Sequence, residues 1–152
     1  MDPENIEWRR PSEFWDFPSD PPVFLKAGAS ANDVKQGQIG NCWFISALSV
    51  LASREELLKG VTSSLDTTNG VLTPETMNKF SKGVYPPLFH CYRYKGMYVF
   101  RFFKNFQWLY VIIDDRLPCE IDGPPVFGQC KELNELWVPL IEKAYAKLHG
   151  CY

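Results

Sequence analysis

One short segment of the chain combines residues that could carry out covalent chemistry, Gln36-Gly-Gln-Ile-Gly-Asn-Cys-Trp43. An apolar run follows Cys42, so its sulfur is expected in the first turn of a helix. There, the helix dipole and unpaired N–H groups favour thiolate over thiol. A thiolate in that position can attack a carbonyl carbon. The side-chain amide of Gln36 and the backbone N–H of Cys42 could then hold the oxyanion that forms.

A structural role is the alternative for this cysteine, because free cysteines are usually small buried hydrophobes. The other four cysteines lack zinc-site spacing and form no Cys-x-x-Cys pair, and we interpret them as structural thiols: Cys91, Cys119, Cys130 and Cys151. A second candidate pair, Asp114 and Asp115, is adjacent in a strand and would point to opposite faces. We interpret that pair as a turn.

The helices that must position Cys42 can be outlined from the apolar pattern. Residues 43–51 leave almost no polar face, which predicts a central, buried helix beginning at Cys42 with Asn41 as its N-cap. A short helix is expected near residues 55–59. An amphipathic helix packed on the core is expected at 136–149, stopped by Gly150.

The rest of the chain predicts loops and a small sheet. Prolines punctuate an N-terminal arm at 1–34 that should wrap a surface, and polar residues suggest a surface insertion at about 61–87. Three aromatic and β-branched runs, 88–94, 97–103 and 107–113, predict an antiparallel sheet spanning 88–113. Trp43, Trp137 and the aromatic strands are expected in the core. The expected helices together with this small antiparallel sheet predict the α+β class.

Composition sets the broad limits. The 152 residues are 45% apolar, enough for one domain with a real core. The 16 basic and 18 acidic residues give a net charge of −2 without a block of like charge, which argues against nucleic-acid binding. No signal-peptide pattern and no apolar run of membrane-spanning length is visible, so we expect a cytosolic protein with free thiols.

The segment around Cys42 resembles the active-site signature of the calpains, papain-like cysteine proteases that are usually calcium-dependent. The resemblance continues in the same order along the chain, at Trp8-Arg-Arg-Pro-Ser-Glu13, at 108–118 and at 135–152, where Glu142-Lys-Ala-Tyr-Ala-Lys147 is nearly verbatim. Only about 61–87 lacks a counterpart. The resemblance implies that residues 1–152 form the first, cysteine-bearing half of a papain-like protease core.

By matching position, the resemblance implies that Cys42 is the nucleophile and Gln36 the oxyanion-hole residue. The family's second half supplies the histidine and asparagine, and we expect this chain to stop before it. We interpret His90, in a predicted strand, and His149, at a helix end, as structural groups. General acid–base catalysis is worth about 10²–10⁴-fold, so this half alone should be inactive on protein substrates.

Calcium is the second implication of the resemblance. The matching ligands are the carbonyls of Lys26 and Gly28 and the side chains of Asp33 and Glu135, an all-oxygen set that suits calcium. Ala31 stands where the family often has a basic residue. The alternative is that the two carboxylates are simply a loop carboxylate and a helix-start carboxylate favoured by the dipole.

Two classes of function remain open at this point. The chain is either the nucleophile-bearing half of a calpain-type endopeptidase or a non-catalytic interaction or regulatory module with the same fold. A following β-rich half that carries histidine and asparagine would favour the enzyme, and its absence would favour the module.

Overall fold

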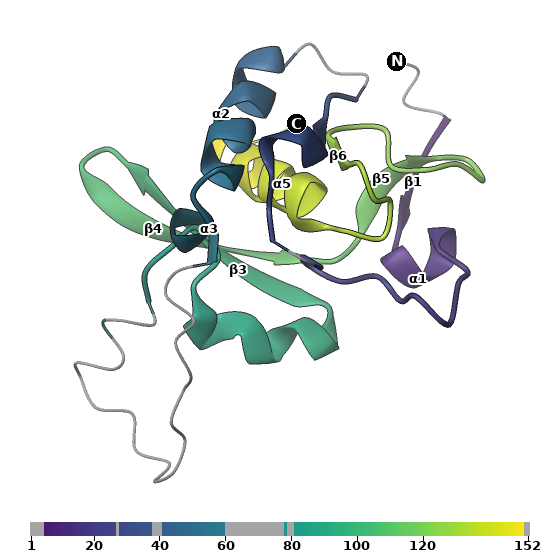
Figure 1. Cartoon of the computed structure of the whole chain (residues 1–152), viewed down its shortest axis with the longest axis horizontal. Coiled ribbons are helices and arrows are strands. Elements are labelled where there is room, and N and C mark those ends of the chain that lie inside the picture. Colours follow the sequence, from purple (N-terminus) through teal and green to yellow (C-terminus); the bar gives the residue numbers. More distant parts are fainter. Residues whose placement is uncertain (1–4, 27, 38–40, 60–77, 79–80, 151–152) are drawn as a thin grey trace, which may run out of the picture.

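A computed structural model describes residues 5–26, 28–37, 41–59, 78 and 81–150 of the chain. Its helical elements are α1 (Pro11–Phe14), η2 (Ala31–Asp33), α2 (Cys42–Ala52), α3 (Glu55–Lys59), η3 (Pro87–Lys95) and α5 (Trp137–His149). Its strands are β1 (Ile6–Arg9), β2 (Val34–Lys35), β3 (Met97–Lys104), β4 (Gln107–Asp114), β5 (Leu117–Glu120) and β6 (Gln129–Cys130). Helices beside antiparallel strand pairs confirm the predicted α+β class (Figure 1).

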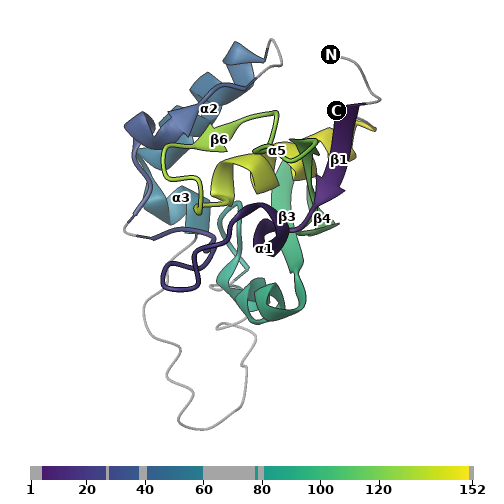
Figure 2. The same ribbon diagram turned by 90° about the vertical axis from the view of Figure 1, so that its right-hand side faces the viewer.

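The C-terminal helix α5 lies at the centre of the fold, between α2 and the strand pairs (Figures 1 and 2). Its buried positions cover most of its circumference: Trp137, Val138, Pro139, Leu140, Ile141, Glu142, Ala144 and Ala146. It ends at Gly150, which adopts a left-handed φ of 107° that favours glycine. The predicted helix is therefore present, and it is more deeply buried than an amphipathic surface helix.

The helix that begins at Cys42 is not the central buried helix that the sequence predicts. Only one face of α2 is buried, through Phe44, Leu48 and Ala52, which are spaced four residues apart. Trp43 and Val50 are 60% and 69% exposed. The prediction was wrong because an all-apolar helix needs packing partners on every side, and the described residues cover only one side of α2.

The β3–β4 hairpin confirms two of the three predicted strands. Its register runs from Met97↔Asp114 to Lys104↔Gln107, and the two turn residues, Asn105 and Phe106, have φ of 52° and 61°, as a type I′ turn requires. β4 buries the alternate residues Val111 and Ile113, whereas β3 buries three in a row, Tyr98, Val99 and Phe100. The expectation that the aromatic strands are core therefore holds only in part, since four of their large side chains are exposed: Phe103, Trp108, Tyr110 and Ile112.

The third predicted strand, at 88–94, is wrong. This segment forms the 3₁₀ helix η3, with Pro87 at its first position and Gly96 as a left-handed C-cap with φ 68°. The run contains aromatic residues but none of Val, Ile or Thr, so its preference for strand is weaker than that of its neighbours. His90 consequently lies in a helix and not in a strand.

The end of the expected surface insertion belongs to the core. The N–H groups of Val84 and Tyr85 donate to the carbonyls of Leu57 and Leu58 at 2.8 and 2.7 Å. The Tyr85 ring packs on Phe24 of the N-terminal arm with centroids 4.1 Å apart. Residues 60–77, 79 and 80 lie outside the described residues. Within the described ranges, no helix combines the length and apolarity that a membrane crossing requires.

Two further strand pairs join segments that precede Cys42 to segments near residues 117–130, and neither pair is evident from the sequence. β1 of the N-terminal arm pairs with β5, from Ile6↔Glu120 to Arg9↔Leu117. β2 pairs with β6 through Val34↔Cys130 and Lys35↔Gln129. Strands this short are set by long-range pairing, so local pattern does not reveal them.

Replacing Phe106 with glycine should stabilise the chain by about 1 kcal/mol, because a left-handed residue with a Cβ carries a steric cost that glycine lacks. Phe106 is 96% exposed, so little packing is lost. Thermal unfolding should show a rise in Tm of about 2–4 °C. Phe106→Ala, which removes the ring but keeps the Cβ, is the matched control and should show no rise. An equal rise in both variants would contradict the strain argument.

Candidate active site

Cys42 occupies the first position of α2, with its thiol free and exposed. The helix is started by the Asn41 carbonyl, which accepts hydrogen bonds from Phe44 N at 2.8 Å and Ile45 N at 3.1 Å. One turn later, the Ser46 hydroxyl donates to the Cys42 carbonyl at 2.8 Å. The alternative that Cys42 is a buried apolar residue is therefore wrong, since its side chain is open to solvent beside the positive end of an 11-residue helix.

Gln36 follows strand β2 in an exposed position. The next residue, Gly37, lies so close to the backbone of Val126 and Phe127 that a Cβ there would overlap the Phe127 carbonyl. Only glycine fits this approach. The pairing of β2 with β6 and the contact at Gly37 thus hold the segment on both sides of Gln36. Residues 38–40, which join it to Asn41, lie outside the described residues.

A buried carboxylate stands behind the start of α2. Glu142 of α5 is only 4% exposed, and its two oxygens accept hydrogen bonds from the Asn41 side-chain Nδ2 and from Gly128 N, the latter at 2.7 Å. Burial raises the pKa of Glu142, and the bonds from Gly128 and Asn41 oppose that rise. Asn41 is the N-cap by position, as predicted, but its side chain makes no capping bond to α2.

Aromatic rings cover the other side of the helix start. The Trp43 ring lies 5.7 Å from that of Tyr145 on α5, and Phe44 lies 4.6 Å from the same ring. Trp43 nevertheless remains 60% exposed, so the expectation that it is a core residue is wrong. Trp137 is fully buried, as predicted. An exposed indole therefore stands directly beside the exposed thiol.

Both histidines interact with carbonyls in their own part of the chain. His90 Nε2 lies 3.0 Å from the Tyr85 carbonyl, and burial lowers the pKa of His90. His149 Nδ1 lies 3.0 Å from the Tyr145 carbonyl, one turn back in α5. These contacts fit the structural roles predicted for the two residues.

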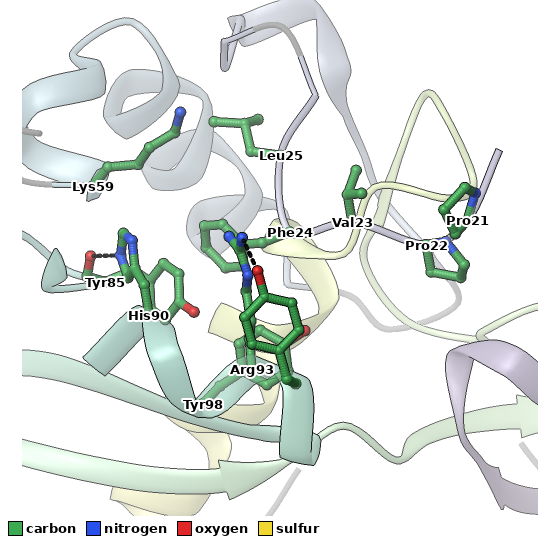
Figure 3. A pocket seen from close by; sticks show the side chains of 11 residues that line it. Pro21, Pro22, Val23, Phe24, Leu25, Lys59, Tyr85, His90, Arg93 and Tyr98 are labelled. Carbon is green, nitrogen blue, oxygen red and sulfur yellow. Dashed lines mark hydrogen bonds between the residues drawn. The ribbon is translucent and has the colours of Figure 1, made fainter. Parts of the chain in front are cut away.

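A cavity of about 560 Å³ opens elsewhere on the molecule, between the N-terminal arm and η3 (Figure 3). The described residues that line it are Pro21, Pro22, Val23, Phe24, Leu25, Lys59, Tyr85, His90, Arg93, Tyr94 and Tyr98. None of them is a predicted catalytic or metal-binding residue, so this cavity is separate from the surface around Cys42.

A comparison with known protein families finds a match over the whole chain. A family model described as "Calpain family cysteine protease" matches residues 1–152. The chain belongs to the calpain family of cysteine proteases. The family assignment rests on the whole chain and not on the cysteine segment alone.

Curated calpains are similar to the chain over nearly all of its length. Calpain-5 of Caenorhabditis elegans is 40% identical over 97% of this chain and 19% of its own length. The Calpain-2 catalytic subunit of Bos taurus is 36% identical over 97% and 17%. The calpain-type cysteine protease ADL1 of Oryza sativa subsp. japonica is 35% identical over 96% and 6%. The chain thus spans less than a fifth of each of these calpains.

Two of the four residues that match calpain calcium ligands, Lys26 and Glu135, are in contact where the N-terminal arm meets the start of α5. Glu135 is buried, and its Oε1 accepts the Lys26 N–H at 2.7 Å. Asp33 accepts the Ser30 N–H at 2.8 Å, and its own carbonyl accepts from Lys131 at 2.7 Å. Gly28 has a left-handed φ of 104°. The described residues contain no group of three His, Cys, Asp or Glu side chains arranged to hold a metal ion.

The hydrogen bonds of Asp33 and Glu135 show which of their oxygens remain available to a calcium ion. One oxygen of Asp33 and one of Glu135 are occupied by backbone N–H groups. No hydrogen bond from a described residue reaches the other oxygen of either carboxylate. Calcium prefers oxygen ligands, so the free oxygen of each carboxylate is the part of the predicted ligand set that these hydrogen bonds leave available.

The remaining described cysteines of this calpain chain divide by burial. Cys119 and Cys130 are buried, and burial raises the pKa of their thiols to about 11 and about 12. Cys91 is exposed on η3. Cys151 lies outside the described residues. Cys91 is therefore the matched exposed thiol with which the reactivity of Cys42 can be compared.

Iodoacetamide at near-neutral pH should modify Cys42 and Cys91 in the folded chain and spare Cys119 and Cys130. A pKa of about 11 leaves about 100-fold less thiolate than an ordinary thiol, and burial also blocks access. Peptide mass spectrometry after timed labelling measures each site, and labelling in denaturant is the control in which all sites should react. Native labelling of Cys130 at the rate of Cys91 would contradict the burial.

Proposed function

We propose that the chain is the nucleophile-bearing half of a calpain-type cysteine endopeptidase that acts on protein substrates. The exposed thiol of Cys42 at the first position of α2 carries this proposal. Membership of the calpain family supports it. Because the chain spans only 6–19% of the relatives named above, catalysis is assigned to a longer protein and not to this half alone.

In the proposed reaction the Cys42 thiolate attacks the carbonyl carbon of a peptide bond. The carbonyl oxygen gains the negative charge, and the N–H of Cys42 and the amide of Gln36 stabilise that oxyanion. Collapse of the intermediate forms a thioester and releases an amine, which must take up a proton. Water then hydrolyses the thioester and returns the thiol.

The proton must come from outside this half. His90 and His149 are held by carbonyls of Tyr85 and Tyr145. A second half with histidine and asparagine would supply the acid and base, as the calpain resemblance implies. The exposed apolar face of α2, with Trp43 and Val50, offers a surface on which such a half could pack. This half alone should therefore be inactive.

The proposal extends to calcium and to location. Calcium would bind the carbonyls of Lys26 and Gly28 and the carboxylates of Asp33 and Glu135, and would neutralise charge where the arm meets α5. A cytosolic location agrees with the free thiols of the described cysteines. The competing function, a non-catalytic module, predicts that Cys42 behaves like any exposed thiol.

Grafting this chain in place of the matching 147 residues of the Bos taurus Calpain-2 catalytic subunit tests the nucleophile. Cleavage of an unfolded protein substrate should be measurable in the graft and absent after Cys42→Ala, with Cys91→Ala as the matched control that retains activity. In the ungrafted chain, alkylation of Cys42 should be about two- to fivefold faster than that of Cys91. Cleavage unaffected by Cys42→Ala would refute the assignment, and equal alkylation rates would favour the module.

Calcium binding should raise the Tm of the chain. At calcium roughly tenfold above its dissociation constant, mass action gives a rise of about 3–5 °C. Glu135→Gln and Asp33→Asn should abolish the rise, because both remove ligand charge while keeping an acceptor for Lys26 N or Ser30 N. Asp122→Asn, at an exposed turn, is the control that should retain it. A rise that survives both ligand variants would place the ion elsewhere.

A further inference from the structure

Glu142 ties together three segments that are distant in the sequence. Its carboxylate lies on the central helix α5 and accepts from Asn41, immediately before Cys42, and from Gly128 in the loop before β6. A side chain at Gly128 would be crowded, since a Cβ there would lie 3.0 Å from Glu142 Oε2 and 3.1 Å from Ile45 Cδ1. The buried acid is thus enclosed by the two backbone segments that it joins.

The bond to Asn41 replaces the local capping that a helix start normally has. An asparagine N-cap usually accepts an N–H of its own helix, but the Asn41 side chain donates outward to Glu142 instead. The Asn41 carbonyl nevertheless accepts the first hydrogen bonds of α2, from Phe44 and Ile45. The position of the first turn of α2, and of Cys42 within it, is therefore fixed by a tertiary contact.

The hydrogen bond to Gly128 links Glu142 to the segment that carries Gln36. Gly128 follows Phe127, whose carbonyl is in close contact with Gly37. Gly37 is the residue next to Gln36. One carboxylate thus contacts the segment that carries the thiol directly, and contacts the segment that carries the amide through Gly128 and Phe127.

We propose that Glu142 is a positioning residue that sets the geometry of Cys42 through Asn41 and of Gln36 through Gly128 and Phe127. The proposal rests on the proposed function, because it gives Glu142 a role in preparing that nucleophile. It also accounts for a buried carboxylate in a helix whose other buried residues are apolar, since two donors on separate segments need two acceptor oxygens.

Alkylation of Cys42 relative to Cys91 in the 152-residue chain tests this role. Glu142→Leu keeps a similar volume but removes both acceptors, and the Cys42:Cys91 rate ratio should fall about two- to fivefold, to near one, as the first turn of α2 loosens. Glu142→Gln should retain most of the ratio. Its oxygen can still accept from Gly128. Its NH₂ can donate to the Asn41 Oδ1 once the Asn41 side-chain amide turns over, because Nδ2 is the atom that faces Glu142 in the native chain.

A double-mutant cycle and a stability control separate positioning from general destabilisation. Asn41→Ala should lower the ratio alone, and adding Glu142→Leu should lower it no further, because both remove the same contact. Leu117→Ala, which truncates a buried side chain of β5, should lower Tm but leave the ratio unchanged. If Glu142→Leu fails to fold, Asn41→Ala beside Leu117→Ala still decides the question.

The outcomes distinguish the positioning role of Glu142 from the proposed nucleophilic role of Cys42. A native ratio above one that falls in Glu142→Leu and Asn41→Ala but not in Leu117→Ala supports the positioning role. A native ratio above one that the Glu142 and Asn41 variants leave unchanged overturns that role and leaves the proposed nucleophile intact. A native ratio of one overturns both, because there is then no activated thiol to position.

Discussion

The burial of α5 is the constraint on which the rest of the structure depends. A helix covered on nearly every side needs a partner on each face, and the chain meets that need with short strand pairs drawn from its whole length. Any polar side chain in such a helix must find its hydrogen bonds inside the protein. Glu142 finds its two partners beside the candidate nucleophile, so the demand that stabilises the core also fixes the start of α2.

In contrast to α5, helix α2 leaves one apolar face exposed to solvent. Phe44, Leu48 and Ala52 anchor the helix to the core, while Trp43 and Val50 project into solvent. Apolar side chains on an exposed helix face lose nothing by being covered and gain free energy from it. The exposed apolar side chains of α2 therefore offer a surface for a packing partner beside the Cys42 thiol.

Elements with a local signature could be predicted from the sequence, and those that depend on distant partners could not. The long apolar repeat gave the bounds of α5 to within one residue, and the β-branched runs identified β3 and β4. The aromatic residues of η3 favour a strand, but the lack of β-branched residues and the proline at its start favour the helix that forms. The roles of Cys42 and Gln36 come from their types and spacing, and they stay predictions. The Glu142 contact could not be predicted, since 101 residues separate it from Asn41.

The same dependence on burial sorts the thiols of the chain. Cys119 and Cys130 lie in strands that face the core, where burial raises the pKa of each thiol far above neutrality. Cys42 lies instead at a helix end that the described chain leaves uncovered. Burial therefore separates the two core thiols from the exposed thiol of Cys42. The difference is whether packing covers the part of the element that carries the thiol. The start of α2 is left uncovered, and Glu142 contacts it through Asn41.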